Sequence, residues 1–183
     1  MNTNKSFNGT RVAVLLGALC FSTLVFAAPI EVKLEVDGSK LAVIDNSQPC
    51  DATNSKDACI NVKKNKAPFI NFILEGACGD ETSTSPNKDY QLTGIRITLI
   101  EKVWPTSSNV LNELVAKDFK ADPETGEIIL KGNNKKDKNL LKFKNRNSHG
   151  YTVYYEVSAE PCAADSDLDD IFLDPEIRNK GRG

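Results

Sequence analysis

Alternation of apolar and polar residues marks much of this chain as β-strand. It is clearest at residues 30–36 (IEVKLEV), where every second residue is apolar and the residues between them are charged. A period of two is typical of a strand that buries one of its faces. The pair Asp37-Gly38 follows and favours a tight turn, so we expect residues 40–45 (KLAVID) to return as the second strand of a hairpin.

Further strands are expected along the rest of the chain. The apolar run from Phe69 to Leu74 suits a central strand. Other strands are expected at residues 94–104, 126–131, 139–145, 150–158 and 171–173. Alternation within GYTVYYEVS places Tyr151 and Tyr155 in the core and Tyr154 outside. The last ten residues, DPEIRNKGRG, have the composition of an extended tail.

Helical spacing is found in one segment, residues 107–119 (SSNVLNELVAKDF), whose apolar residues cluster on one side. We expect a turn or two of helix there, although strand-like alternation explains the last part of the segment about as well. Many short strands with at most one short helix predict an all-β fold. The expected architecture is an antiparallel β-sandwich, packed in the immunoglobulin-like manner.

The N-terminus has the pattern of a secretory signal peptide. Lys5 and Arg11 precede an apolar run at residues 12–26 that is too short to cross a bilayer comfortably. We expect residues 1–27 to be cleaved, which leaves residues 28–183 as a single β-sandwich domain. No later segment is long and apolar enough to span a membrane, so the mature chain is expected to be soluble and either secreted or periplasmic.

Four cysteines remain after cleavage: Cys50, Cys59, Cys78 and Cys162. An even number in an exported chain predicts two disulfides. We favour Cys50–Cys59, which closes a polar loop, and Cys78–Cys162, which ties the middle of the chain to its end; the crossed pairings stay open. A zinc site is not expected, because the chain has no Cys-x-x-Cys pair and its single histidine is far from all four cysteines in sequence.

Charge is unevenly distributed along the chain. The mature part carries 21 basic and 25 acidic residues once Lys5 and Arg11 are removed, which does not suggest a nucleic-acid partner. Residues 131–146 are strongly basic and residues 160–176 strongly acidic. The basic segment either binds an anionic partner or protects a sheet edge with lysines. A third reading is that the two segments lie together in one molecule and partly cancel.

The acidic segment contains a weak calcium candidate. Asp165, Asp167 and Asp169 occupy positions one, three and five of a twelve-residue stretch that ends at Glu176. These are the ligand types of a helix–loop–helix calcium site. Position six is Asp170 where such a loop needs glycine, and neither flank has a helical pattern. We therefore expect a polar connection and no metal site of this kind.

The sequence contains no recognisable catalytic motif. His149, next to Ser148 in a turn, is the only histidine. No nucleophile elbow, zinc-protease helix or phosphate-binding glycine loop occurs. We therefore expect a non-catalytic protein without a cofactor, and a hydrolase is the least favoured class.

The leading hypothesis is an exported module that binds a protein, a glycan or a hydrolase to be inhibited, in the cell envelope or outside the cell. The residues expected to contact this partner are Trp104, Tyr154, Lys135, Lys136 and Lys138. The alternative is a structural subunit of a surface fibre or coat. In that case the alternating N-terminal strand of one subunit would complete the sheet of the next.

Overall fold

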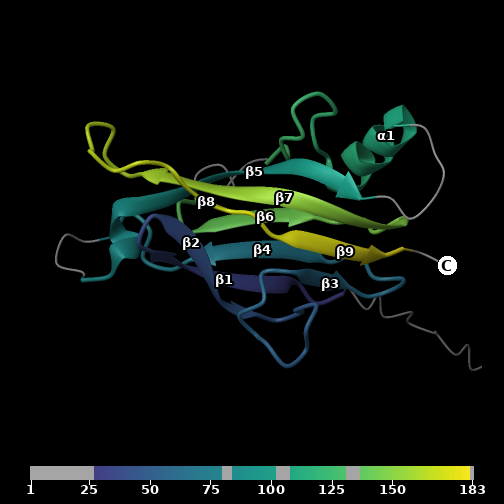
Figure 1. Ribbon diagram of the computed structural model, residues 1–183, viewed down its shortest axis with the longest axis horizontal. Helices are drawn as coiled ribbons and strands as arrows, with labels where there is room; N and C mark the ends of the chain where they lie inside the picture. Colours follow the sequence, from purple (N-terminus) through teal and green to yellow (C-terminus); the bar gives the residue numbers. More distant parts are fainter. Residues whose placement is uncertain (1–26, 80–83, 102–107, 131–136, 182–183) are drawn as a thin grey trace, which may run out of the picture.

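A computed structural model describes residues 27–79, 84–101, 108–130 and 137–181. In these residues two β-sheets pack face to face, and one α-helix lies at an end of the sandwich (Figure 1). The fold is therefore an all-β sandwich, as the strand pattern predicts. Except for Ala27, the predicted signal peptide lies outside the described residues.

The first sheet has the strand order β2-β1-β4-β6. Its strands are β1 (Ile30–Asp37), β2 (Lys40–Asn46), β4 (Phe69–Leu74) and β6 (Leu140–Lys144). β1 and β2 form the expected hairpin, in which Gly38 adopts a φ of 61° in the two-residue turn. Glycine suits this position because side chains disfavour positive φ. β1 also pairs with β4 in parallel, so both of its edges are paired within the molecule.

The second sheet has the order β3-β9-β7-β5, and β8 also pairs with β7. Its strands are β3 (Ile60–Val62), β5 (Tyr90–Glu101), β7 (Gly150–Pro161), β8 (Ile171–Leu173) and β9 (Glu176–Lys180). The helical elements are the 3₁₀ turn η1 (Pro86–Asp89) and helix α1 (Ser108–Phe119). Because β3 and β9 run parallel, each sheet contains one parallel pair, which alternation alone does not indicate.

Two segments differ from the expected strand pattern. In the expected strand at 126–131, the described residues 126–130 make isolated bridges, Glu127 to Arg96 and Ile128 to Ala121, in place of a continuous strand, and residue 131 lies outside the described ranges. The reason is a turn at Gly126, which has a φ of 74° and lets the segment touch the edge of β5 only briefly. Within the expected tail, residues 176–180 form β9, which is paired on both sides in the second sheet.

A single hydrophobic cluster fills the space between the sheets. β7 contributes Tyr151, Val153, Tyr155 and Val157, each at most 3% exposed, and this confirms the predicted alternation. Tyr154 points to the outside and is half-buried. The ring of Tyr155 lies 5.5 Å from that of Phe72 on the facing sheet, so aromatic packing joins the two layers.

Two disulfides cross-link the sandwich, with the pairing that we favoured. Cys50–Cys59 closes the loop between β2 and β3, with Cα atoms 5.3 Å apart. Cys78–Cys162 joins the segment after β4 to the end of β7, with Cα atoms 5.5 Å apart. Stable disulfides of this kind indicate an oxidising compartment. In the described part of the chain, no helix has the length and apolar character needed to cross a bilayer.

Removing the two disulfides is expected to have unequal effects on stability. The sequence separations are 84 residues for Cys78–Cys162 and 9 for Cys50–Cys59. Loop-closure entropy then predicts losses of about 4.6 and 2.6 kcal/mol in the free energy of unfolding. Urea unfolding of the variants Cys78→Ala/Cys162→Ala and Cys50→Ala/Cys59→Ala measures the difference. Equal losses, or a larger loss for the short loop, would contradict this expectation.

Candidate functional site

The loop between β2 and β3 presents a continuous polar surface. Residues 51–56 (DATNSK) are all exposed. They contain no large apolar side chain, so the loop gains almost nothing from hydrophobic burial. Its shape must therefore come from covalent and hydrogen bonds. We call residues 50–59 the disulfide loop.

Short polar side chains hold the disulfide loop in two consecutive turns. Asp51 Oδ1 accepts hydrogen bonds from Thr53 N at 2.9 Å and Thr53 Oγ1 at 2.7 Å. The same bonds lower the pKa of the Asp51 carboxyl, because they favour its charged form. Asn54 Oδ1 accepts from Lys56 N at 3.1 Å, and Asp57 Oδ2 accepts from Asp51 N at 3.0 Å. The bonds that Asp51 and Asn54 accept from the backbone nitrogen two residues later are Asx turns, which order a loop without a core.

A buried asparagine attaches the disulfide loop to the sandwich. Asn46, the last residue of β2, is 2% exposed. Its Nδ2 donates to the carbonyl oxygens of Asp57 at 2.8 Å and Cys59 at 3.0 Å. Its Oδ1 accepts from Gln48 N at 2.9 Å. The C-terminal end of the loop, and the chain just before Cys50, are thus tied to the frame through one side chain.

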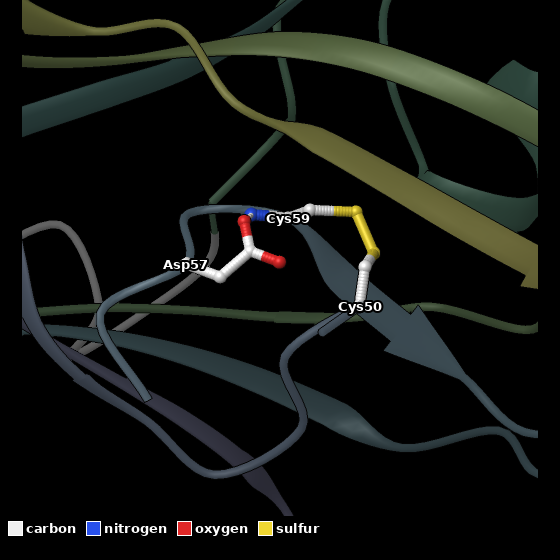
Figure 2. A group of neighbouring side chains, drawn as sticks. All are labelled: Cys50, Asp57 and Cys59. Carbon is white, nitrogen blue, oxygen red and sulfur yellow. Dashed lines mark hydrogen bonds between the residues drawn. A yellow bond between two sulfur atoms is a disulfide. The ribbon is translucent and has the colours of Figure 1, made fainter. Parts of the chain in front are cut away.

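Cys50, Asp57 and Cys59 bring three potential metal ligands within 4.8 Å of one another (Figure 2). The two sulfurs are bonded to each other, so neither is available as the thiolate that binds zinc. The Asp57 carboxylate is also engaged, since it accepts from the backbone nitrogens of Asp51 and Cys59. In the oxidised protein this group is a cross-linked turn.

A second polar group surrounds Asp118 in the last turn of α1. Asp118 is 1% exposed. Its Oδ2 accepts from Tyr151 Oη at 2.7 Å and Ser148 N at 2.9 Å, and its Oδ1 accepts from Ser148 Oγ at 2.5 Å. His149 Nδ1 lies 2.8 Å from Ser148 Oγ on the exposed side. The structure therefore joins one acid, two hydroxyls and the only histidine of the sequence.

The order of this group differs from that of a catalytic triad. In a triad the histidine lies between the acid and the nucleophile, so that it can take the nucleophile's proton and be oriented by the acid. Here Ser148 lies between Asp118 and His149. Because the Ser148 hydroxyl donates to Asp118, these hydrogen bonds anchor α1 to the β6–β7 connection.

Two core tyrosines near this group have raised pKa values for different reasons. Burial raises the pKa of Tyr151, and the hydrogen bond and negative charge of Asp118 raise it further, whereas the neighbouring amide of Asn179 opposes the shift. Burial alone raises the pKa of Tyr155. Its hydroxyl has no hydrogen-bond partner among the described residues.

Two of the five predicted contact residues lie in the described part of the chain. Tyr154 lies on the outward face of β7, across from Leu99 and Glu176. Lys138 is exposed just before β6, where its carbonyl accepts from the backbone nitrogen of Leu92 at 3.1 Å. The other three predicted contacts lie outside the described residues: Trp104, Lys135 and Lys136.

The four residues of the weak calcium candidate lie in two parts of the second sheet. Glu176 belongs to β9 and pairs with Arg178. Asp165, Asp167 and Asp169 are exposed in the connection from β7 to β8 and do not gather with Glu176 into a ligand group within the described ranges. Asp169 instead lies near Tyr90. Burial raises the pKa of Tyr90, and the charges of Asp169 and Asp89 raise it further.

The same substitution at the two core tyrosines is expected to change stability in opposite directions. Tyr151→Phe removes a hydrogen bond to a buried carboxylate and is expected to lower the free energy of unfolding by about 2 kcal/mol. Tyr155→Phe removes a buried hydroxyl that lacks a partner and is expected to raise it by about 1 kcal/mol. Urea unfolding of both variants is the measurement, and shifts of the same sign would refute the assignment.

The raised tyrosine pKa values also predict weakening of the fold at alkaline pH. Below the ordinary tyrosine pKa of about 10 both hydroxyls keep their protons in the folded and the unfolded chain, so they add no pH dependence to the stability. Above that pH the free energy of unfolding falls, because the unfolded chain releases protons that the folded chain retains. Above about pH 10, the unfolding free energy of the Tyr155→Phe variant should fall with pH less steeply than that of the parent. The difference in slope is expected to be about 1.4 kcal/mol per pH unit. Urea unfolding as a function of pH measures this, and identical slopes for the two proteins would contradict it.

Comparison with known proteins assigns no relatives to this arrangement. No family model and no curated protein matches the chain.

Proposed function

We propose that this protein is an exported, non-catalytic binding module and that the disulfide loop is its recognition element. The observation that carries the proposal is that residues 51–56 are held in a fixed shape although they contribute almost nothing to the core. All six are exposed, yet a disulfide, consecutive turns and the buried Asn46 hold them in one shape. Because this loop contributes so little to the core, we infer that its fixed shape serves to present its exposed side chains to a partner.

Preorganisation is the physical advantage of such a loop. A flexible loop loses about 1–2 kcal/mol of backbone entropy for each residue that a partner orders. A loop already held in its bound shape avoids most of this loss, so more of the contact energy contributes to affinity. A rigid sandwich that carries exposed loops is a common basis for recognition.

The chemistry of the loop favours a polar partner. Its exposed groups are carboxylate, amide, hydroxyl and ammonium, with no large apolar anchor between the cysteines. A protein surface or a glycan of the envelope or exterior fits this set. Inhibition of a hydrolase by insertion into its cleft is less favoured. Cleft-binding segments are extended, whereas residues 51–57 form two turns closed by backbone bonds from Asn54 to Asp51 and from Asp57 to Asn54.

The alternative role in a fibre has less support. A donor strand must be free to enter the sheet of another subunit. β1 is the segment with the right alternation, but it is already paired with β2 and β4 in its own sheet. The signal-peptide pattern and the two disulfides support a secreted or periplasmic location for the module.

The proposal is tested by affinity capture with a matched pair of surface variants. The oxidised protein is immobilised and exposed to envelope and medium fractions of the source organism, and to an array of glycans. The loop variant is Ala52→Arg/Lys56→Glu, which changes exposed side chains outside the turn bonds described above. We expect it to lose at least about tenfold in binding, because a bulky residue and a reversed charge face the partner.

The control variant is Ala164→Arg/Lys64→Glu, which makes the same two kinds of change, with the same change in net charge, at exposed positions outside the disulfide loop. It should bind as the parent does. The proposal fails if the parent binds nothing dose-dependently, or if the loop variant and the control bind equally well. Circular dichroism and thermal unfolding of each variant show whether it has folded.

A further inference from the structure

The two ends of the disulfide loop are held together by contacts that do not depend on the bond between the sulfurs. The backbone nitrogen of Cys50 donates to the carbonyl oxygen of Cys59 at 3.0 Å, and Pro49 forms an antiparallel bridge with Ile60. Residues that lie opposite each other in such a pair have neighbouring side chains. Neither cysteine belongs to the hydrophobic cluster between the sheets. The fold therefore places two thiols next to each other when the disulfide is reduced.

The carboxylate of Asp57 lies beside the two sulfurs, within 4.8 Å of both (Figure 2). Its Oδ1 accepts from Cys59 N at 2.9 Å, and its Oδ2 accepts from Asp51 N at 3.0 Å. A carboxylate oxygen that accepts one hydrogen bond still has a second lone pair. Asp57 can therefore bind a cation and keep the hydrogen bonds that position it.

A second carboxylate adds negative charge next to the sulfurs. Glu176 Oε1 lies 3.1 Å from Cys59 Sγ, and the same carboxylate pairs with Arg178. The disulfide itself is neutral, so the oxidised loop carries no further charge there. In the reduced loop, two thiolates would lie beside the Asp57 and Glu176 carboxylates, and like charges at this distance repel one another. A bound divalent cation removes this repulsion.

The donor atoms select the class of cation. Two thiolates and a carboxylate suit Zn²⁺, whereas Ca²⁺ and Mg²⁺ prefer ligand sets made of oxygen alone. In a tetrahedral zinc site with Zn–S bonds of about 2.3 Å, the two sulfurs lie about 3.8 Å apart. The Cα atoms of Cys50 and Cys59 are 5.3 Å apart, so rotation of the two side chains reaches this spacing without movement of the backbone.

We propose that the reduced disulfide loop binds Zn²⁺ through Cys50, Asp57 and Cys59, with water as the fourth ligand, and that formation of the disulfide releases the metal. Binding displaces one proton from each thiol. On release, the two thiolates lose two electrons and form the S–S bond, while a disulfide oxidant takes up these electrons and two protons and becomes two thiols. Thiols are kept reduced in the cytosol, so the zinc-binding form precedes the cross-linked form. The site is independent of the partner proposed above, which binds the oxidised loop.

Titration of the reduced mature chain with Co²⁺, a coloured substitute for Zn²⁺, tests the proposal. The chain is reduced with a phosphine, and oxygen is excluded. We expect one Co²⁺ to bind per chain, with the strong visible absorption of tetrahedral cobalt and a thiolate-to-cobalt charge-transfer band in the near ultraviolet. Added Zn²⁺ should abolish both signals, and the oxidised chain should show neither. A reduced chain that binds no Co²⁺, or that gives only the weak absorption of octahedral cobalt, would overturn the proposal.

A matched pair of acid variants tests the role of Asp57 as a ligand. Asp57→Asn should weaken Co²⁺ binding at least about tenfold, because a charged ligand is replaced by a neutral one. The control is Asp51→Asn, which removes a charge from the same loop and keeps the side-chain oxygen that accepts from Thr53. It should bind Co²⁺ as the parent does. Equal affinities of the two variants would contradict the assignment of Asp57.

Protection from oxidation gives a test in the parent chain, where the second disulfide is the internal control. Bound Zn²⁺ should slow the formation of Cys50–Cys59 by oxidised glutathione at least about tenfold, because both thiolates are engaged by the metal. The rate for Cys78–Cys162 should not change. Alkylation of the remaining thiols, digestion and mass spectrometry measure both rates. Equal slowing of the two disulfides, or no slowing of Cys50–Cys59, would show that zinc does not bind at this pair.

Discussion

The sandwich depends on buried asparagine side chains at the places where the chain passes from one sheet to the other. Such crossings bury backbone N–H and C=O groups that no strand neighbour can satisfy. Asn147, fully buried, donates to two carbonyls of the β3–β4 connection and accepts from the backbone nitrogen of Gly181. Asn145 donates to Asn179 of β9 at 2.7 Å. Two connections and the end of the chain are thus held together by amides.

Buried asparagines also lie at the edges of the sandwich, where they hold surface elements in place. Asn46 fixes the disulfide loop, and Asn87 accepts from Val36 N at 2.8 Å while donating to the carbonyl of Glu75 at 3.0 Å. An amide suits these positions because it can donate and accept at once without a buried charge. The surface elements are therefore positioned by interior polar contacts.

The sequence by itself determined most of the strands, the inward side of β7, the hairpin at Gly38 and the presence of two disulfides. These follow from local alternation, turn chemistry and the even number of cysteines. Only the tertiary structure decided the parallel pairs, the short β3 and β9, and the role of Asp118. Strand direction and partners depend on distant residues, and three to five residues are too few for a clear period. In the sequence, the buried asparagines and Asp118 look like ordinary turn and surface residues. Their burial is favourable only because the fold supplies hydrogen bonds to them.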